Sequence, residues 1–135
     1  GVIAAPYAPF SLLLHRCAAS VHHGGIGSTA QALRSGRPAL VIPHAHDQFN
    51  NALLTHRLGV SRMLARHRVT VARLAQELSA LLEDHAYAPA AAPLAPRIGA
   101  EDGAAVAAGH IERLVLSRRP AEVIEPEPET VPARR

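Results

Sequence analysis

The strongest constraint on the fold is an alternation along the chain between short apolar runs and amphipathic stretches. Three apolar runs are each short enough to be a strand: 18–21, 39–42 and 60–64. Each is followed by a stretch with helical periodicity: 29–34, 47–58 and 70–82. Strands and helices that alternate at this spacing are typical of a parallel sheet with helices on its faces. The sequence therefore predicts an α/β fold of the Rossmann-like class.

Other segments are predicted from less regular patterns: 2–5 as the tail of a strand, 12–14 as a short helix, 86–96 as an irregular Ala/Pro crossing, and 104–115 as an amphipathic helix. Glu101 and Asp102 stand before the last of these, where a helix N-terminus favours negative charge. We expect the leucines of 12–14 and the apolar stripe of 71–82 to belong to the core.

Length and composition bound the number of domains. The chain has 135 residues, of which 48% are hydrophobic, and this suits one compact domain. We predict that this domain covers 1–118 and that 119–135, which is rich in Pro and Glu, is a disordered tail. Because Gly1 stands at the first position and Met63 is the single methionine, we expect a piece of a longer product, or a processed or trimmed one.

Charge and hydropathy exclude several classes of protein. The formal net charge of +3 is far below the dense basic field of a nucleic-acid-binding protein. One group of arginines could attract phosphate or an anionic lipid surface, or could be a solvated rim: Arg57, Arg62, Arg66, Arg68 and Arg73. No run reaches the ~18 apolar residues of a membrane-spanning helix. Because Cys17 is the only cysteine, no disulfide forms within the chain, and we expect a cytoplasmic protein with at most peripheral membrane contact.

The most informative segment is the glycine-rich turn of residues 22–29, which joins a predicted strand to a predicted helix. Glycines let the backbone approach a ligand, and the first N–H groups of a helix and its dipole favour an anion. His23 and Ser28 could add donors to a phosphate oxygen, and His22 is expected to pack beneath the turn. The turn lacks the third glycine of dinucleotide folds and the lysine of a P-loop. On spacing alone, a phosphate site and a merely tight turn are equally good interpretations.

A second polar segment, residues 43–52, follows the next predicted strand. Because ligands bind at the carboxyl ends of parallel strands, this segment should lie beside the glycine-rich turn. Asp47 and Gln48 supply acceptors and donors that suit the hydroxyl groups of a sugar. His44 and His46 beside Asp47 could begin a metal site, but no further ligand follows at a recognised spacing. We therefore predict no metal and no cofactor.

Both segments together resemble the C-terminal domain of family 1 glycosyltransferases, which are GT-B enzymes of the UDP-glycosyltransferase type. The residues that carry this resemblance are 22–33, 36–38, Pro43, Asp47-Gln48 and Asn51-Ala52. The nearest branch is the bacterial one that glycosylates lipids, sterols, polyketides and other natural products, rhamnosyltransferases included. The resemblance covers about residues 6–64 and continues weakly to the last predicted helix.

The resemblance implies a role for each matching residue. The donor diphosphate would be held by residues of the glycine-rich turn: His23, Gly24, Gly25, Gly27, Ser28 and Thr29. Asp47 and Gln48 would contact hydroxyls of the transferred sugar. Gln31 falls where plant members carry a glutamate that binds the ribose, and Phe10 falls near a glutamine that they use on the nucleobase. Both UDP-hexose and dTDP-hexose therefore stay open as donors.

Two functions are compatible with this resemblance. In the first, the chain is the donor-binding half of a glycosyltransferase that moves a hexosyl group to a hydroxyl of a small lipophilic acceptor. The acceptor site and the catalytic histidine of the family would then lie in an N-terminal domain, so no catalytic residue is assigned in this chain, and the chain alone is expected to be inactive. In the second, the chain is a truncated, non-catalytic homologue that binds a nucleotide sugar or assists a partner transferase.

Overall fold

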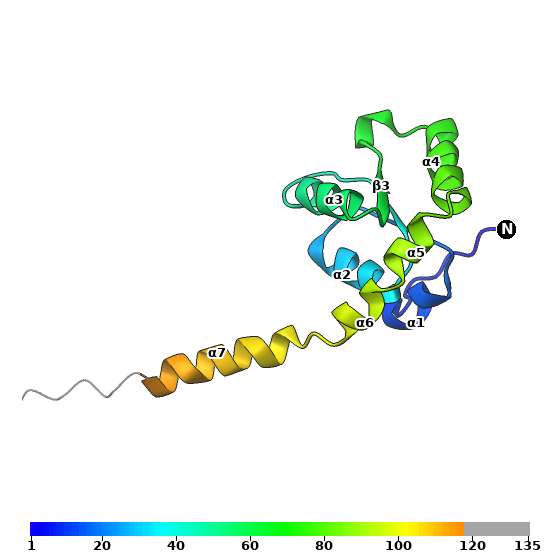
Figure 1. The fold of residues 1–135 in the computed structure, drawn as a ribbon. Helices are drawn as coiled ribbons and strands as arrows, with labels where there is room; N and C mark the ends of the chain where they lie inside the picture. The colour runs from blue at the N-terminus through cyan, green and yellow to red at the C-terminus, as the bar shows by residue number, and fades with distance from the viewer. Residues whose placement is uncertain (118–135) are drawn as a thin grey trace, which may run out of the picture. The chain divides into compact units, whose positions relative to one another are not determined.

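The structure is a computed structural model that describes residues 1–117 (Figure 1). The strands in this part of the chain are β1 (Ser20–His22), β2 (Ala39–Val41) and β3 (Ser61–Met63). The helices are α1 (Phe10–Leu13), α2 (Ile26–Ser35), α3 (Gln48–Arg57), α4 (Val71–Glu83), α5 (Tyr87–Ala91), α6 (Leu94–Gly99) and α7 (Gly103–Ser117). Short 3₁₀ turns follow α1 and β3, at Leu14–Arg16 and Arg66–Arg68.

The strands form one parallel sheet in the order β1-β2-β3. In the central strand, Leu40 pairs with Val21 of β1 and with Arg62 of β3. Because the three strands run in the same direction, their carboxyl ends meet at one edge of the sheet. The predicted α/β fold with a parallel sheet is confirmed.

Helices cover both faces of β2, which is buried at every position. On one face the buried core residues come from β2, α2 and α3: Ala32, Ala39, Val41 and Ala52. On the other face they come from β2, the end of β3 and α4: Leu40, Leu64 and Leu81. A strand covered on both faces cannot alternate apolar and polar residues, which explains the continuous apolar run of 39–42.

Two helix ends carry residues that suit their positions. Gly36 directly follows α2 with a φ of 65°, the left-handed conformation that ends many helices and that glycine adopts without strain. At the start of α4, the hydroxyl of Thr70 accepts the N–H of Arg73 at 3.2 Å and so caps the first turn.

Two segments differ from the sequence prediction. Residues 2–5 form no strand, since none of the three strands pairs with this run and Val2 and Ile3 are exposed. The stretch 86–96 was predicted to be irregular but contains α5 and the start of α6. Pro89 and Pro96 are each the third residue of their helix, where the missing N–H would have no intrahelical partner. The alanines around them are strong helix formers, and this decides the conformation.

The predicted core is wrong in part. Leu12 at the first predicted helix is 65% exposed, and on α4 Val71 is 89% and Leu82 52% exposed. Along the α4 stripe, Leu81 is buried in the core cluster with Leu40, and Leu74 and Leu78 are partly buried against that cluster. Helical periodicity shows which face turns inward but not how far along the helix the contact extends.

The described residues from Asp102 onward belong to a second unit, separate from residues 1–101. Its helix α7 begins where the two acidic residues predicted a start, since Oδ1 of Asp102 accepts the N–H of Ala105 at 2.9 Å. The division into a domain over 1–118 and a disordered tail over 119–135 stays a prediction, and the tail lies outside the described residues. None of the helices within 1–117 combines the length and apolar content that crossing a bilayer requires.

Candidate functional site

The glycine-rich turn leaves β1 at a point where the backbone passes very close to its neighbours. Gly24 has a φ of 87°, and a Cβ at this position would lie 2.8 Å from Cγ1 of Val41 and 3.0 Å from the backbone oxygen of Gln48. The N–H of Gly24 donates to Nδ1 of His22 at 3.1 Å, which fixes the start of the turn. Both the conformation and the space therefore require glycine at position 24.

Helix α2 then begins with backbone donors that the helix does not use. Its first intrahelical bond runs from the N–H of Thr29 to the carbonyl oxygen of Gly25 at 2.9 Å, so the N–H groups of residues 26–28 have no partner within the helix. A Cβ on Gly27 would meet no atom within 4 Å, which leaves open space next to these groups. Free N–H groups, the helix dipole and the hydroxyl of Ser28 together make an anion-binding edge.

The loop after β2 presents the second polar segment at the same edge. Oε1 of Gln48 accepts the N–H groups of His44 at 2.8 Å and Ala45 at 3.1 Å. The carbonyl half of this amide is therefore occupied by its own loop, and its two Nε2 hydrogens are left for a ligand. The neighbouring Asp47 is exposed. In the part of the chain that the structure describes, no three potential metal-ligating side chains gather.

Asn51 of α3 joins the two segments directly. Its Nδ2 group donates to the carbonyl oxygen of Gly24 at 2.9 Å and to Oδ2 of Asp47 at 2.9 Å. The turn and the loop thus lie side by side, as their places after neighbouring parallel strands predicted. From the sequence, Asn51 is predicted only to carry part of the family resemblance, without a role of its own. Its spacing of four residues from Asp47 on a predicted helix was a usable signal, because side chains at this spacing are neighbours.

Two predicted site residues lie away from this edge. The side chain of Thr29 is 5% exposed, and its hydroxyl points beneath α2 rather than toward the free N–H groups. Gln31 is one helical turn beyond Ser28 and lines an open hollow of about 600 Å³ together with residues 5–11. This hollow has the size of a small-molecule site.

His22 packs beneath the turn, as predicted. Burial first, and the charge of the neighbouring His23 second, lower the pKa of His22 below its ordinary value of 6.5. The ring is therefore neutral at neutral pH. Because Nδ1 accepts a hydrogen bond, the ring hydrogen must lie on Nε2.

Comparisons with known proteins point to one family. A family model described as Erythromycin biosynthesis protein CIII-like, C-terminal domain, matches residues 1–114. The chain is 34% identical over 120 residues to an aklavinone 7-beta-L-rhodosaminyltransferase of Streptomyces galilaeus, which covers 89% of this chain and 27% of that protein. It is 33% identical over 113 residues to a 3-alpha-mycarosylerythronolide B desosaminyl transferase of Saccharopolyspora erythraea, with 84% and 27% covered.

Solved structures agree with this assignment. The glycosyltransferase VinC in complex with DTDP matches with a TM-score of 0.76 and 28% identity, over 84% of this chain and 29% of that one. The spinosyn rhamnosyltransferase SpnG, complexed with thymidine diphosphate, matches with a TM-score of 0.68 and 28% identity, over 78% and 29%. The resemblance to the C-terminal domain of GT-B glycosyltransferases is confirmed. The chain spans between a quarter and a third of the length of each of these proteins.

The buried His22 predicts a pH dependence of stability. Below about pH 6.5 the unfolded chain binds a proton at this residue that the folded chain excludes, so the free energy of unfolding should fall as the pH drops. The contribution is fully present above the unfolded pKa and is lost as the pH falls through the lower folded pKa. Urea-unfolding midpoints between about pH 5 and 7.5 measure it. The His22→Asn variant is the control, because its Oδ1 can accept the Gly24 N–H without titrating, and an unchanged pH slope in this variant contradicts the assignment.

The bridge from Asn51 predicts a clear loss of stability on an isosteric change. Asn51→Asp replaces both donated hydrogens by a carboxylate that faces the Gly24 carbonyl and the Asp47 carboxylate. We expect the free energy of unfolding to fall by about 1–3 kcal/mol. Asn50→Asp, an exposed neighbour on the same helix, carries the same change of charge and should lose far less in urea unfolding. Equal losses in the two variants would argue against the bridge.

Proposed function

We propose that this chain, which belongs to the Erythromycin biosynthesis protein CIII-like C-terminal domain family, binds a nucleoside diphosphate sugar as the donor-binding part of a glycosyltransferase. The observation that carries the proposal is the juxtaposition made by Asn51. It ties an anion-binding turn to a loop whose side chains suit sugar hydroxyls. A donor that joins a diphosphate to a hexose needs these two chemistries side by side.

The diphosphate is bound by the glycine-rich turn. The N–H groups of residues 26–28 and the hydroxyl of Ser28 donate to its oxygens, and the absence of a side chain at Gly27 keeps the approach open. The exposed ring of His23 lies against Gly25 and supplies a further donor. During transfer the diphosphate leaves with growing negative charge, and fixed donors at a helix N-terminus stabilise that charge.

The sugar is bound by Asp47 and Gln48, which offer opposite hydrogen-bonding groups. Asp47 retains carboxylate lone pairs that accept hydroxyl hydrogens. Gln48 offers only its Nε2 hydrogens, because its carbonyl oxygen is used within the loop. The subsite therefore requires a hydroxyl hydrogen at one position of the sugar and an acceptor oxygen at the next.

The nucleoside lies in the hollow lined by Gln31 and residues 5–11, one helical turn from the diphosphate turn. The exposed aromatic rings of Tyr7 and Phe10 lie in this segment and offer faces for a base to stack on. We propose a thymidine nucleotide. Gln31 is compatible with this choice, because its amide oxygen can accept the 3′-hydroxyl, which is the only free hydroxyl of a 2′-deoxyribose in a 5′-nucleotide. VinC and SpnG, which share the fold, were solved with thymidine diphosphate.

The reaction proposed for the whole protein is transfer of the hexosyl group to a hydroxyl of a small lipophilic acceptor. The bond from the anomeric carbon to the diphosphate breaks, a bond to the acceptor oxygen forms, and the acceptor proton passes to a general base. We place this base and the acceptor site in parts of the protein outside this chain, since the relatives are about three times longer or more.

Calorimetry with dTDP tests the diphosphate site. Ser28→Ala removes one hydrogen bond to a phosphate oxygen and should cost about 1 kcal/mol, which is roughly a fivefold higher Kd. Ser79→Ala, exposed on α4, is the matched control and should leave the Kd unchanged. The proposal fails if the wild-type chain does not bind dTDP, or if both variants bind it as the wild type does.

The choice between thymidine and uridine depends on Gln31. Gln31→Glu supplies a second acceptor oxygen for the 2′-hydroxyl of a ribose, so the ratio of the Kd for UDP to the Kd for dTDP should fall. Gln76→Glu adds the same charge at an exposed position of α4 and should leave that ratio unchanged. A ratio that is equal in the wild type and in Gln31→Glu would contradict the thymidine assignment.

A further inference from the structure

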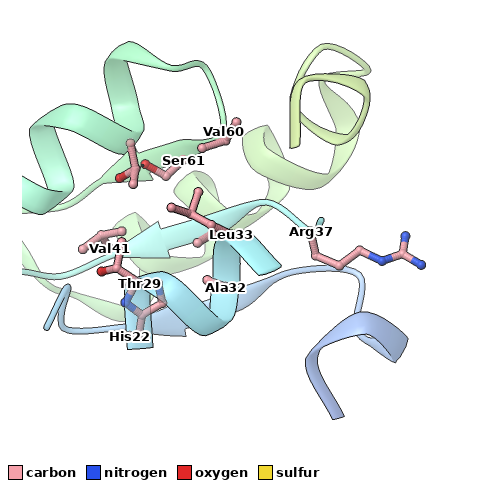
Figure 2. A pocket seen from close by; sticks show the side chains of 10 residues that line it. His22, Thr29, Ala32, Leu33, Arg37, Val41, Val60 and Ser61 are labelled. Atoms are coloured by element: carbon pink, nitrogen blue, oxygen red, sulfur yellow. Dashed lines mark hydrogen bonds between the residues drawn. The ribbon is translucent and has the colours of Figure 1, made fainter. Parts of the chain in front are cut away.

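A small cavity lies beneath the glycine-rich turn, between the sheet and the helices α2 and α3 (Figure 2). About 10 Å³ of it is open to the centre of a water-sized sphere. This is close to the least space that holds one water molecule. The aliphatic side chains of Ala32, Leu33 and Val41 form much of its wall. Arg37 lies at the margin, with its side chain directed away from the cavity (Figure 2), and two pairs of smaller polar side chains line the rest.

The first polar group is the pair formed by His22 on β1 and Thr29 on α2, whose side chains lie next to each other in Figure 2. Nε2 of His22 and Oγ1 of Thr29 are both buried, and neither has a hydrogen-bond partner within residues 1–117. Since Nδ1 of His22 accepts from Gly24, Nε2 carries a hydrogen that needs an acceptor. Leaving two such groups unpaired would cost about 1–3 kcal/mol each.

The second polar group is formed by the hydroxyls of Thr55 and Ser61, at another part of the same wall. Ser61 Oγ donates to Thr55 Oγ1 at 2.8 Å, and Thr55 Oγ1 donates to the carbonyl oxygen of Asn51 at 2.9 Å. The hydrogens of both hydroxyls are therefore used, and lone pairs remain on the cavity side for a donor.

We propose that one water molecule is bound in this cavity, where it accepts the Nε2 hydrogen of His22 and donates to Oγ1 of Thr29. Its second hydrogen is directed along the cavity toward the hydroxyls of the second group. Two or three hydrogen bonds are typical of a buried water. A direct bond from His22 to Thr29 is the alternative, and it would leave the cavity dry.

This water makes His22 and Thr29 positioning residues for the glycine-rich turn. It holds the imidazole hydrogen on Nε2, so Nδ1 stays free to accept the N–H of Gly24 and keeps the turn in its left-handed conformation. Thr29 thus acts on the donor through His22 rather than by touching the diphosphate. This second step rests on the proposed function, whereas the water itself does not.

The test uses nuclear magnetic resonance on the full chain labelled with ¹⁵N at histidine. We expect His22 to show the Nε2–H tautomer and its Nε2 hydrogen to give a cross-peak to a long-lived water. Thr29→Val, which has nearly the same shape without the hydroxyl, should lose that cross-peak and bind dTDP several-fold more weakly. Thr29→Ser, which keeps the hydroxyl, should restore both signals.

Three results would overturn the proposal. These are an Nδ1–H tautomer of His22, a Nε2 hydrogen without contact to water, and a Thr29→Val variant whose tautomer, water signal and dTDP affinity all match the wild type. If the wild-type chain shows the water but no affinity for dTDP, the donor function fails and the water site stands. The two proposals are therefore tested separately.

Discussion

The site depends on how closely the backbone of Gly24 approaches β2 and α3. That approach has no room for a Cβ, and it brings the carbonyl oxygen of Gly24 within reach of Asn51. This contact fixes two features of the site. Helix α2 starts with its free N–H groups at the sheet edge, and the loop that carries Asp47 lies against the turn. A bulkier residue at position 24 would separate the N–H groups that we propose to bind the diphosphate from the side chains that we propose to bind the sugar.

The polar contacts around this point form one continuous network rather than separate pairs. Gly24 is held through its N–H by His22 and through its carbonyl oxygen by Asn51. The backbone oxygen of Asn51 in turn accepts from Thr55, which accepts from Ser61 of β3. The network thus reaches from β1 across α3 to the far strand of the sheet. Buried networks of this kind fix one conformation only when each member is satisfied.

Much of the fold could be predicted because it is local in the sequence. The apolar run at 39–42 predicts a buried strand from its own residues alone, and the structure confirms this strand. The solvent exposure of a side chain also depends on residues that are distant in the sequence. Leu81 is buried and the adjacent Leu82 is half exposed, because successive helical residues point about 100° apart. No pattern within the helix tells how far α4 reaches along the sheet. In 86–96, the prolines predicted an irregular segment. The sequence alone did not show that Pro89 and Pro96 would lie in the first turn of a helix, where proline is tolerated.

The juxtaposition of the two site segments was predictable from parallel strands, but the contact that joins them was not, because it spans 27 positions in the sequence. This spacing has a consequence for how such a chain can evolve. A change at Gly24 alters what Asn51 can bind, and a change at Asn51 alters what Asp47 can hold, so the effects of single substitutions at these positions will not add. A substitution at one of the three residues therefore changes the energetic cost of a substitution at the other two.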